Sequence, residues 1–245
     1  MSDPFHTTRW SIVLAAGNSD DQHGSKAGQA LETLCQTYWF PLYAYIRRRC
    51  GDEHQAQDLT QAFFHHILDK ATLADANPQR GRFRSFLLTA CKHFITNEWD
   101  RENAKKRGGD VGTLQLDFKY AESNYRIEPS DPITPEIIFE REWAIALLNS
   151  VLDLLKQDYR VRGKEADFDL LKPFLQGNKS ATYSTVAAEM GTTEGSVKVA
   201  VHRLRTRYRE LIRAEIEQTV ESSEHVEDEI RRLFEVLSEK SGKFL

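Results

Sequence analysis

A stretch rich in proline and glycine near the middle of the chain constrains its fold more than any other feature. Three of the seven prolines, Pro129, Pro132 and Pro135, fall within residues 126–135. Glycines extend the same composition back to Gly108. Roughly 25 residues without sustained periodicity are too many for an ordinary loop inside one compact domain. The stretch therefore predicts a linker between two domains.

Both halves have the hydrophobic spacing of helices. Apolar residues recur every three or four positions, as in Leu59, Phe63 and Ile67. We find no comparable run that alternates with period two, so we expect an all-α fold of two small helical domains joined by a flexible linker. The expected parts are an N-terminal extension (1–27), a first domain (28–107), the linker (108–135), a second domain (136–213) and an acidic helical C-terminal extension (214–245).

Charge is distributed unevenly along the 245 residues, although the net charge is only -4. Residues 80–107 hold eight basic and three acidic side chains, a net +5, and residues 194–213 hold six and two, a net +4. Residues 214–245 hold four and nine, a net -5. The two basic blocks favour an anionic partner, and the acidic end of the chain is a candidate to cover one of them.

Several classes of protein are disfavoured by the sequence. No apolar run approaches the roughly 20 residues of a membrane helix, and the N-terminus lacks the pattern of a secretion signal, so we expect a cytoplasmic protein without membrane contact. The three cysteines form no CxxC, which disfavours disulfides and zinc. We find no catalytic motif, and we expect no enzyme activity, no metal and no cofactor.

A helix-turn-helix is the sharpest local signal. A short amphipathic helix at 182–190 is followed by Gly191, and Thr192 or Thr193 can cap a second helix. In such a motif the second helix enters the major groove of DNA, so its outer face needs hydrogen-bond donors. The basic side chains there are Lys198, His202, Arg203, Arg205, Arg207 and Arg209. A solvated arginine-rich helix is the alternative.

Aromatic and basic residues are interleaved between 80 and 107. Rings such as Phe86 and Trp99 alternate with cations such as Arg84, Lys92 and Arg101. Aromatics at helical spacing usually belong to a core, but beside a basic helix they could also stack unpaired bases while the cations hold phosphates. A third segment, 57–64, places Asp58 and Gln61 on one polar helix face, for which a solvated surface is the alternative.

Taken in order, these three segments resemble the extracytoplasmic-function type of bacterial RNA polymerase sigma factor. Residues 56–63, AQDLTQAF, look like the polymerase-clamp motif of that family, and residues 83–90, FRSFLLTA, look like its promoter-melting helix. Residues 183–211, with GSVK at 195–198 and HRLR at 202–205, resemble its C-terminal helix-turn-helix. The resemblance covers about 28–107 and 136–213.

The resemblance implies a transcription initiation factor whose partners are core RNA polymerase and promoter DNA, with an anti-sigma factor as a further candidate. The first domain would bind the clamp helices of the largest subunit, and would read and melt the minus-ten element. The second domain would dock on the flap of the second-largest subunit and read the minus-thirty-five element. The implied polymerase contacts are Asp58, Gln61 and Phe64; the implied minus-ten contacts are Arg84, Phe86, Lys92, His93, Asn97, Trp99 and Arg101; the implied minus-thirty-five contacts are Thr193, Ser196, Lys198, His202, Arg203 and Arg205.

Departures from the family pattern affect DNA readout. Phe86 stands where the family commonly has Trp, and Lys92-His93 stands where it often has Arg-Asn or Val-Asn. Val199-Ala200 replaces a common Ser-Arg. We expect the pocket for a flipped base to prefer a different base, and upstream readout to be weaker or shifted onto His202, Arg203 and Arg205.

The extensions and the function class leave alternatives open. Residues 8–14 predict an extra helix packed on the first domain, and residues 214–245 predict a helix that either shields a basic DNA-binding surface or simply packs. The competing function is a polymerase-independent helix-turn-helix transcriptional regulator. That reading predicts specific duplex binding by the isolated protein and provides no role for the aromatic and basic segment.

Overall fold

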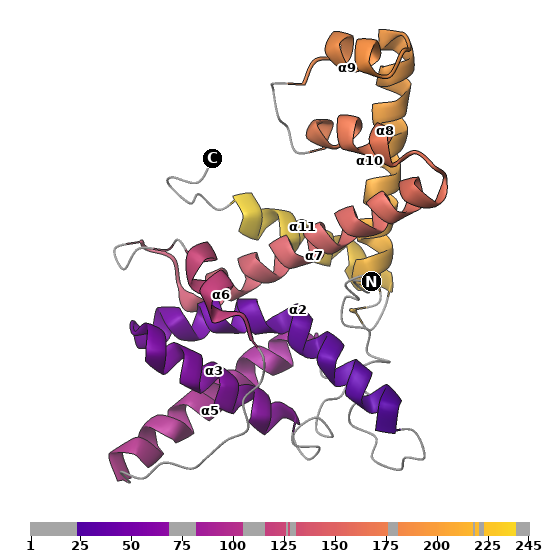
Figure 1. Cartoon of the computed structure of the whole chain (residues 1–245). Helices are drawn as coiled ribbons and strands as arrows, with labels where there is room; N and C mark the ends of the chain where they lie inside the picture. Colours follow the sequence, from indigo (N-terminus) through magenta and orange to yellow (C-terminus); the bar gives the residue numbers. More distant parts are fainter. Residues whose placement is uncertain are drawn as a thin grey trace. The chain divides into compact units, whose positions relative to one another are not determined.

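All regular secondary structure that the structure describes is helical, so the expected all-α fold is confirmed (Figure 1). The computed structural model describes residues 24–68, 82–104, 116–125, 127, 131–175, 181–217, 219–220 and 223–238, without the side chains of 24–36, 68, 101–104 and 223. The helix expected at 8–14 and the basic residues 105–107 lie outside this part. None of the helices described here combines the length and apolar character needed to cross a bilayer.

The chain divides into two compact units. Residues Leu147–Glu215 belong to one, here called the helix-turn-helix unit, and the described residues before Leu147 together with those from Ile216 onward belong to the other, here called the N-terminal unit. The change from one unit to the other therefore falls inside a helix, and not in the stretch 108–135. The described residues from Ile216 onward therefore belong with residues on the other side of Leu147–Glu215 in the sequence.

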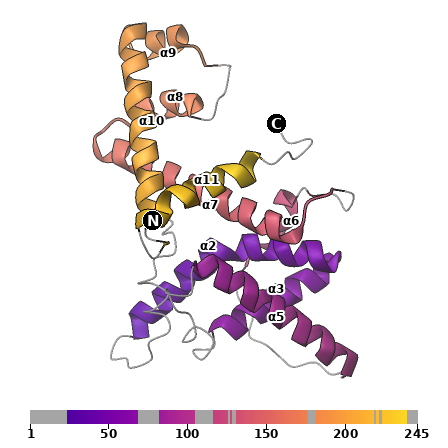
Figure 2. The same ribbon diagram turned by 180° about the vertical axis from the view of Figure 1, so that it is seen from behind.

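Three helices build the core of the N-terminal unit: α2 (Gly24–Cys50), α3 (Glu53–Leu68) and α5 (Phe83–Ala104). They lie side by side in both views (Figures 1 and 2). Their apolar faces meet, so that Leu42, Phe63 and Ile95 are all fully buried. The polar faces of these helices point away from the core and can contact other molecules.

The turn between α2 and α3 explains why the first helix ends where it does. Gly51 has φ +75, a left-handed conformation that glycine adopts without the steric penalty of a side chain. The Asp52 carboxylate then accepts the backbone N–H of Gln55 at 2.8 Å, which caps the start of α3. The polar face of α3 is therefore fixed relative to α2.

Part of the expected flexible linker is a helix. Helix α6 (Phe118–Asn124) is capped by the Asp117 side chain and packs on α2. Glu122 accepts hydrogen bonds from the Tyr43 hydroxyl and, at 2.8 Å, from Arg47 Nε. The Phe118 ring lies against Trp39 with its centroid 6.3 Å away. The hydrophobic and polar contacts together hold this linker segment on the first domain.

Helix α7 (Pro135–Val161) begins with Pro135 in its first position, where proline is favoured, and the Thr134 hydroxyl accepts the N–H of Ile137 at 3.3 Å. Its first part belongs to the N-terminal unit, where Phe139 and Trp143 are buried. We assigned this part to the second domain on sequence. Its apolar residues pack in the N-terminal unit instead.

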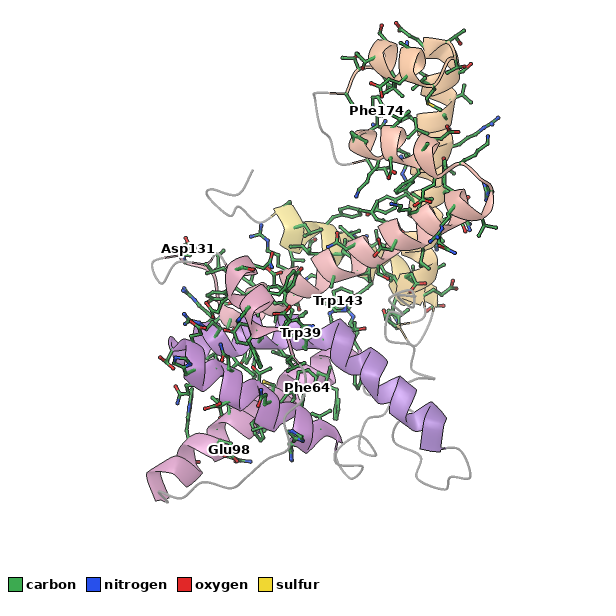
Figure 3. All side chains as sticks on the ribbon, in the orientation of Figure 1. Trp39, Phe64, Glu98, Asp131, Trp143 and Phe174 are labelled. Carbon is green, nitrogen blue, oxygen red and sulfur yellow. The ribbon has the colours of Figure 1, made fainter. Side chains whose placement is uncertain are left out.

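The helix-turn-helix unit has a small core of its own. It contains the rest of α7, α8 (Glu165–Leu171), the 3-10 turn η2 (Lys172–Phe174), α9 (Tyr183–Glu189) and most of α10 (Glu194–Glu217). Figure 3 labels Phe174, whose ring stacks on that of Tyr183 at 4.8 Å. The core also holds Leu155, Phe168, Leu171, Val186, Val197, Val201 and Leu204.

Capping and one glycine fix the angle between α9 and α10. Thr182 and Thr185 form a capping box at the start of α9. Gly191 has φ +61 in the turn, and the Thr193 hydroxyl accepts the N–H of Ser196 at 3.2 Å at the start of α10. The prediction that a threonine caps the second helix is thus confirmed for Thr193.

The acidic extension contains a helix that packs on the N-terminal unit. After the 3-10 turn η3 (Ser223–His225), helix α11 (Val226–Ser238) buries Val226, Leu233 and Val236 along one face. Glu229 lies on the same face and is fully buried. The opposite face exposes charged side chains, so α11 is strongly amphipathic.

Candidate polymerase and nucleic-acid interfaces

The polar face of α3 presents two of the three residues that the sequence predicts for polymerase binding. Asp58 is exposed and Gln61 is half-buried, one helical turn apart. Phe64 is only 2% exposed, and its ring packs against Phe63 in the core. Phe64 therefore supports the helix from behind, because a buried ring offers no surface to a partner.

A second polar surface follows one side of α5. His93 and Asn97 are both exposed and lie one turn apart, on the stripe that also contains the exposed Ser85 and Thr89. The opposite side carries the fully buried Cys91 and Ile95. Two of the predicted minus-ten residues are therefore accessible.

Other predicted minus-ten residues have intramolecular partners in the described structure. Lys92 pairs with Glu136 at 2.9 Å, and the half-buried Phe86 stacks on Phe83 with centroids 5.8 Å apart. The guanidinium of Arg49 lies over the Trp99 ring at 5.3 Å. Arg101 belongs to α5, but its side chain lies outside the described part.

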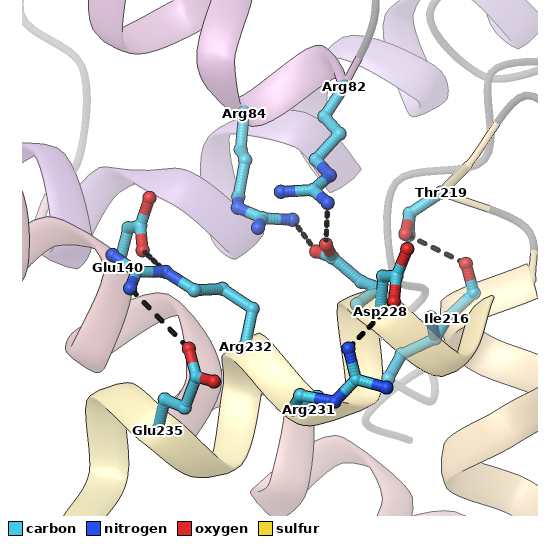
Figure 4. A network of polar contacts seen from close by, with 10 residues as sticks. Arg82, Arg84, Glu140, Ile216, Thr219, Asp228, Arg231, Arg232 and Glu235 are labelled. Carbon is cyan, nitrogen blue, oxygen red and sulfur yellow. Dashed lines mark hydrogen bonds and ion pairs between the residues drawn. The ribbon is translucent and has the colours of Figure 1, made fainter. Parts of the chain in front are cut away.

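Arg84 is placed differently from what the resemblance implies. Its side chain is 5% exposed and forms an ion pair with Glu229 of α11 (Figure 4). The guanidinium also lies over the Trp143 ring at 4.2 Å. Burial, with the neighbouring charge of Arg82, lowers the pKa of Arg84 to about 10, which leaves it charged at neutral pH. A group covered on both sides cannot reach DNA in this arrangement.

Arg82 and Glu229 form a charged cluster with Arg84. The sequence motifs predict a functional role for neither of these two residues. Arg82 Nη2 lies 2.8 Å from Glu229 Oε2, so one carboxylate holds two arginines. Arg82 belongs to the basic segment and could have been found there. Glu229 is one of nine acidic residues in the extension, and helical periodicity marks its position as facing inward together with Val226 and Leu233.

The outer face of α10 carries the predicted upstream DNA contacts. His202 and Arg203 are exposed, as are Ser196 and Lys198 closer to the start of the helix. The Lys198 ammonium lies 5.6 Å from the centre of the Tyr183 ring. Val197, Val201 and Leu204 hold the inner face, so these polar groups project away from the core.

Three residues of this surface also make structural contacts within the unit. Thr193 caps α10, and Arg205 Nη2 donates to the Phe174 carbonyl at 3.0 Å. Arg207 pairs with Asp158 at 3.0 Å and with Glu210 at 3.3 Å. His202 and Arg203 are consequently the strongest candidates for contacts with bases.

Comparison with known proteins gives one domain family and one relative. The family model for Sigma-70 region 2 matches residues 36–105, which include the end of α2, all of α3 and α5, and the turn between α2 and α3. The "ECF RNA polymerase sigma factor SigE" of Mycolicibacterium smegmatis is 24% identical over 182 residues, covering 74% of this chain and 61% of the relative. No solved structure matches the chain.

The family match falls on α3 and α5, which carry two of the candidate surfaces. Residues 36–105 therefore form a helical region similar to Sigma-70 region 2. The relative adds a likeness of the longer chain to a sigma factor of the extracytoplasmic function type. The chain spans about 61% of the length of that relative.

Proposed function

We propose that this protein is a transcription initiation factor that binds core RNA polymerase and directs it to specific promoters. The observation that carries the proposal is the coincidence of the sigma-70 region 2 match with the α2, α3 and α5 core, on which two separate polar surfaces stand. A helix-turn-helix with an exposed basic second helix follows in the same chain. One polymerase surface and two DNA surfaces are the parts that such a factor needs.

The polymerase surface in this proposal is the polar face of α3. Asp58 and Gln61 offer a carboxylate and an amide to the clamp helices of the largest subunit, and charged and amide groups of this kind fix the register of a helical interface. The buried Phe63 and Phe64 behind them keep the face rigid. A rigid face loses little conformational entropy on binding.

The minus-ten surface in this proposal lies along α5. His93 and Asn97 would contact the DNA strand, and Phe86 would stack on an unpaired base, which is worth about 1–3 kcal/mol. Unstacking one base from a duplex takes a few kcal/mol, so a small number of such contacts helps to open the DNA without fuel. Lys92, Arg84, Trp99 and Arg101 complete the proposed set.

The minus-thirty-five surface in this proposal is the outer face of α10, and the same unit would dock on the flap of the second-largest subunit. His202 and Arg203 would reach base edges, while Ser196 and Lys198 would contact phosphates near the start of the helix. Thr193 and Arg205 would contribute mainly by holding the helix in place.

The proposed role requires no active site, because the polymerase performs the chemistry. It implies a cytoplasmic protein that works without a cofactor, with promoter DNA and core polymerase as partners. An anti-sigma factor is a further candidate partner in this proposal. The polymerase-independent regulator accounts for α10 but leaves the region 2 match without a role.

Run-off transcription tests this function. Core RNA polymerase with the purified protein and a library of genomic fragments should produce new start sites that share a sequence element. The double variant Asp58→Ala/Gln61→Ala should abolish binding to core polymerase and keep the wild-type helicity. The control is His54→Ala, which changes an exposed residue of the same helix. Unchanged start sites, with specific duplex binding by the protein alone, would instead support the polymerase-independent regulator.

A further inference from the structure

Helix α11 covers the start of α5 with a charged contact whose carboxylate is fully withdrawn from water. Glu229 is 0% exposed, and it faces the two arginines at the first turn of the proposed melting helix (Figure 4). Burying a carboxylate is unfavourable unless it is paired. Arg84 donates to one oxygen of Glu229, and Arg82 Nη2 lies 2.8 Å from the other, which accepts no hydrogen bond from the described residues. Glu229 is therefore distinguished from the other acidic residues of α11, which are exposed.

The Glu229 carboxylate occupies the position at which these arginines would otherwise bind an anion. A guanidinium binds carboxylate and phosphate with the same kind of N–H donors, so the donors and charge that Glu229 engages are not available to a phosphate. Trp143 covers Arg84 from another side, at 4.2 Å. Neither the charge nor the donors of Arg84 are available to DNA while α11 is in place.

We propose that α11 is an internal cover, which withholds Arg82 and Arg84 from DNA by offering them Glu229 in place of a phosphate. DNA binding along the start of α5 then requires α11 to leave. This inference rests on the proposed function, since it assigns α5 to DNA. It differs from simple packing because it predicts that weakening the contact strengthens DNA binding.

The contacts of α11 suit a helix that can leave its place. Its buried apolar residues are few, namely Val226, Leu233 and Val236, and its second ion pair, Arg232 to Glu140 at 2.8 Å, is only partly buried. A buried ion pair contributes little net stability, because the gain of pairing is offset by the loss of water. A phosphate that takes over the arginines would favour the released form.

Two neighbouring arginines of α11 provide a matched test. Arg232 holds α7 through Glu140, whereas the exposed Arg231 pairs, among the described residues, with Asp228 of α11 itself at 2.9 Å. Arg232→Gln and Arg231→Gln remove the same charge, and loss of a cation by itself should weaken DNA binding. We expect Arg231→Gln to bind a mixed-sequence single-stranded oligonucleotide like the wild type or more weakly. Arg232→Gln should bind it more tightly, because it loosens the cover.

A second pair tests the buried carboxylate itself. Glu229→Gln removes the negative charge between the two arginines. The control, Glu235→Gln, removes an exposed carboxylate charge on the same helix, 3.8 Å from Arg232 Nη1. Each phosphate contact on single-stranded DNA adds about 0.7 to the slope of log affinity against log salt. Freeing one or two arginines should therefore steepen the slope by about 0.7–1.4, equivalent to about 5- to 25-fold tighter binding at 0.1 M salt relative to 1 M.

The results separate the cover from the function on which it rests. Tighter binding in Arg232→Gln and Glu229→Gln, with wild-type helicity by circular dichroism, supports the cover. The cover is overturned if Arg232→Gln and Arg231→Gln behave alike, or if folded Glu229→Gln matches Glu235→Gln. Should Glu229→Gln fail to fold, the arginine pair decides. These assays contain no polymerase, so failure of run-off transcription alone would remove the proposed function while leaving the DNA result intact.

Discussion

Lys92 in α5 and Glu136 in the first turn of α7 form an ion pair, with 2.9 Å between Nζ and Oε1. Burial raises the pKa of Glu136, but the hydrogen bond and charge of Lys92, a backbone hydrogen bond and the charge of Arg49 together outweigh burial, so the pKa lies below its usual value. The pair joins the proposed melting helix to a helix that follows the proline-rich stretch. It also engages one of the cations that the minus-ten surface needs.

We expect Lys92→Gln to affect DNA binding more than stability. Both side chains are about 40% exposed, so solvent screens the pair, and the free energy of unfolding should fall by less than about 1 kcal/mol. Binding of single-stranded DNA should lose about 0.7 from its salt slope if Lys92 contacts one phosphate. Urea unfolding and salt-dependent fluorescence anisotropy measure the two effects. An unchanged slope would remove Lys92 from the DNA surface.

Arg203 and Arg205 should respond differently to replacement by alanine, although they lie two positions apart in α10. Arg203 is exposed, so Arg203→Ala should leave stability within about 0.5 kcal/mol and weaken upstream promoter binding by the polymerase complex. Arg205 donates to the Phe174 carbonyl, and Arg205→Ala should lower the unfolding free energy by about 0.5–1.5 kcal/mol. Thermal unfolding and promoter footprinting compare them; equal effects of both variants would contradict the distinction.

Two glycines of the helix-turn-helix should show opposite responses to alanine. Gly191 has φ +61, so Gly191→Ala should destabilise the unit by about 1–2 kcal/mol even though nothing lies within 4 Å of the added carbon. Gly195 lies in α10, where an added Cβ meets Thr193 Oγ1 at an ordinary 3.8 Å. Gly195→Ala should stabilise by about 0.5–1 kcal/mol. Differential scanning calorimetry measures both, and a stabilising Gly191→Ala would refute the turn geometry.

Glu122 should be the residue that keeps α6 on α2. Burial, together with the hydrogen bond to Glu122, raises the pKa of the Tyr43 hydroxyl well above its usual range. Glu122→Ala leaves the Tyr43 and Arg47 donors without this acceptor and should lower the unfolding free energy by about 1–3 kcal/mol. Ser123→Ala on the same short helix is the control, with an expected change within about 0.5 kcal/mol. Chemical denaturation of the full chain decides between them.

Glu142 in α7 should make stability depend on pH near neutrality. Burial raises its pKa from 4.5 to about 7, against a smaller opposing effect of Arg141. Between these values the folded chain holds a proton that the unfolded chain has lost. The contribution of this group to stability is therefore complete below pH 4.5 and is lost as the pH rises through about 7. Glu142→Gln should flatten this part of the profile, as measured by urea unfolding at several pH values; an unchanged profile would contradict the raised pKa.

The helices and their caps were predictable because they depend on local pattern. Apolar spacing indicates the inward face of α3, and the same spacing recurs in α5 and α10. The helix-turn-helix followed from the position of Gly191 and its flanking threonines. Local steric and hydrogen-bonding rules determine such features, so one sequence is enough to read them.

Contacts between distant segments were harder to predict. Composition alone does not distinguish Glu229 from its acidic neighbours in residues 214–245, and helical periodicity marks its position as inward without identifying its arginine partners. Phe64 and Arg84 illustrate the same difficulty, because a motif assigns residue types to a surface whereas burial depends on what other helices cover. The helix within the linker was missed for this reason too, since α6 is short and its aromatic contacts lie on α2.

The discontinuous composition of the N-terminal unit affects how the protein is made. During translation, Arg84 and Trp143 emerge from the ribosome long before Glu229. The helix-turn-helix unit is synthesised between them. Domains generally fold as they emerge, but this unit must wait until α11 has been translated. A nascent chain that lacks α11 would therefore expose Arg84, which the folded protein buries.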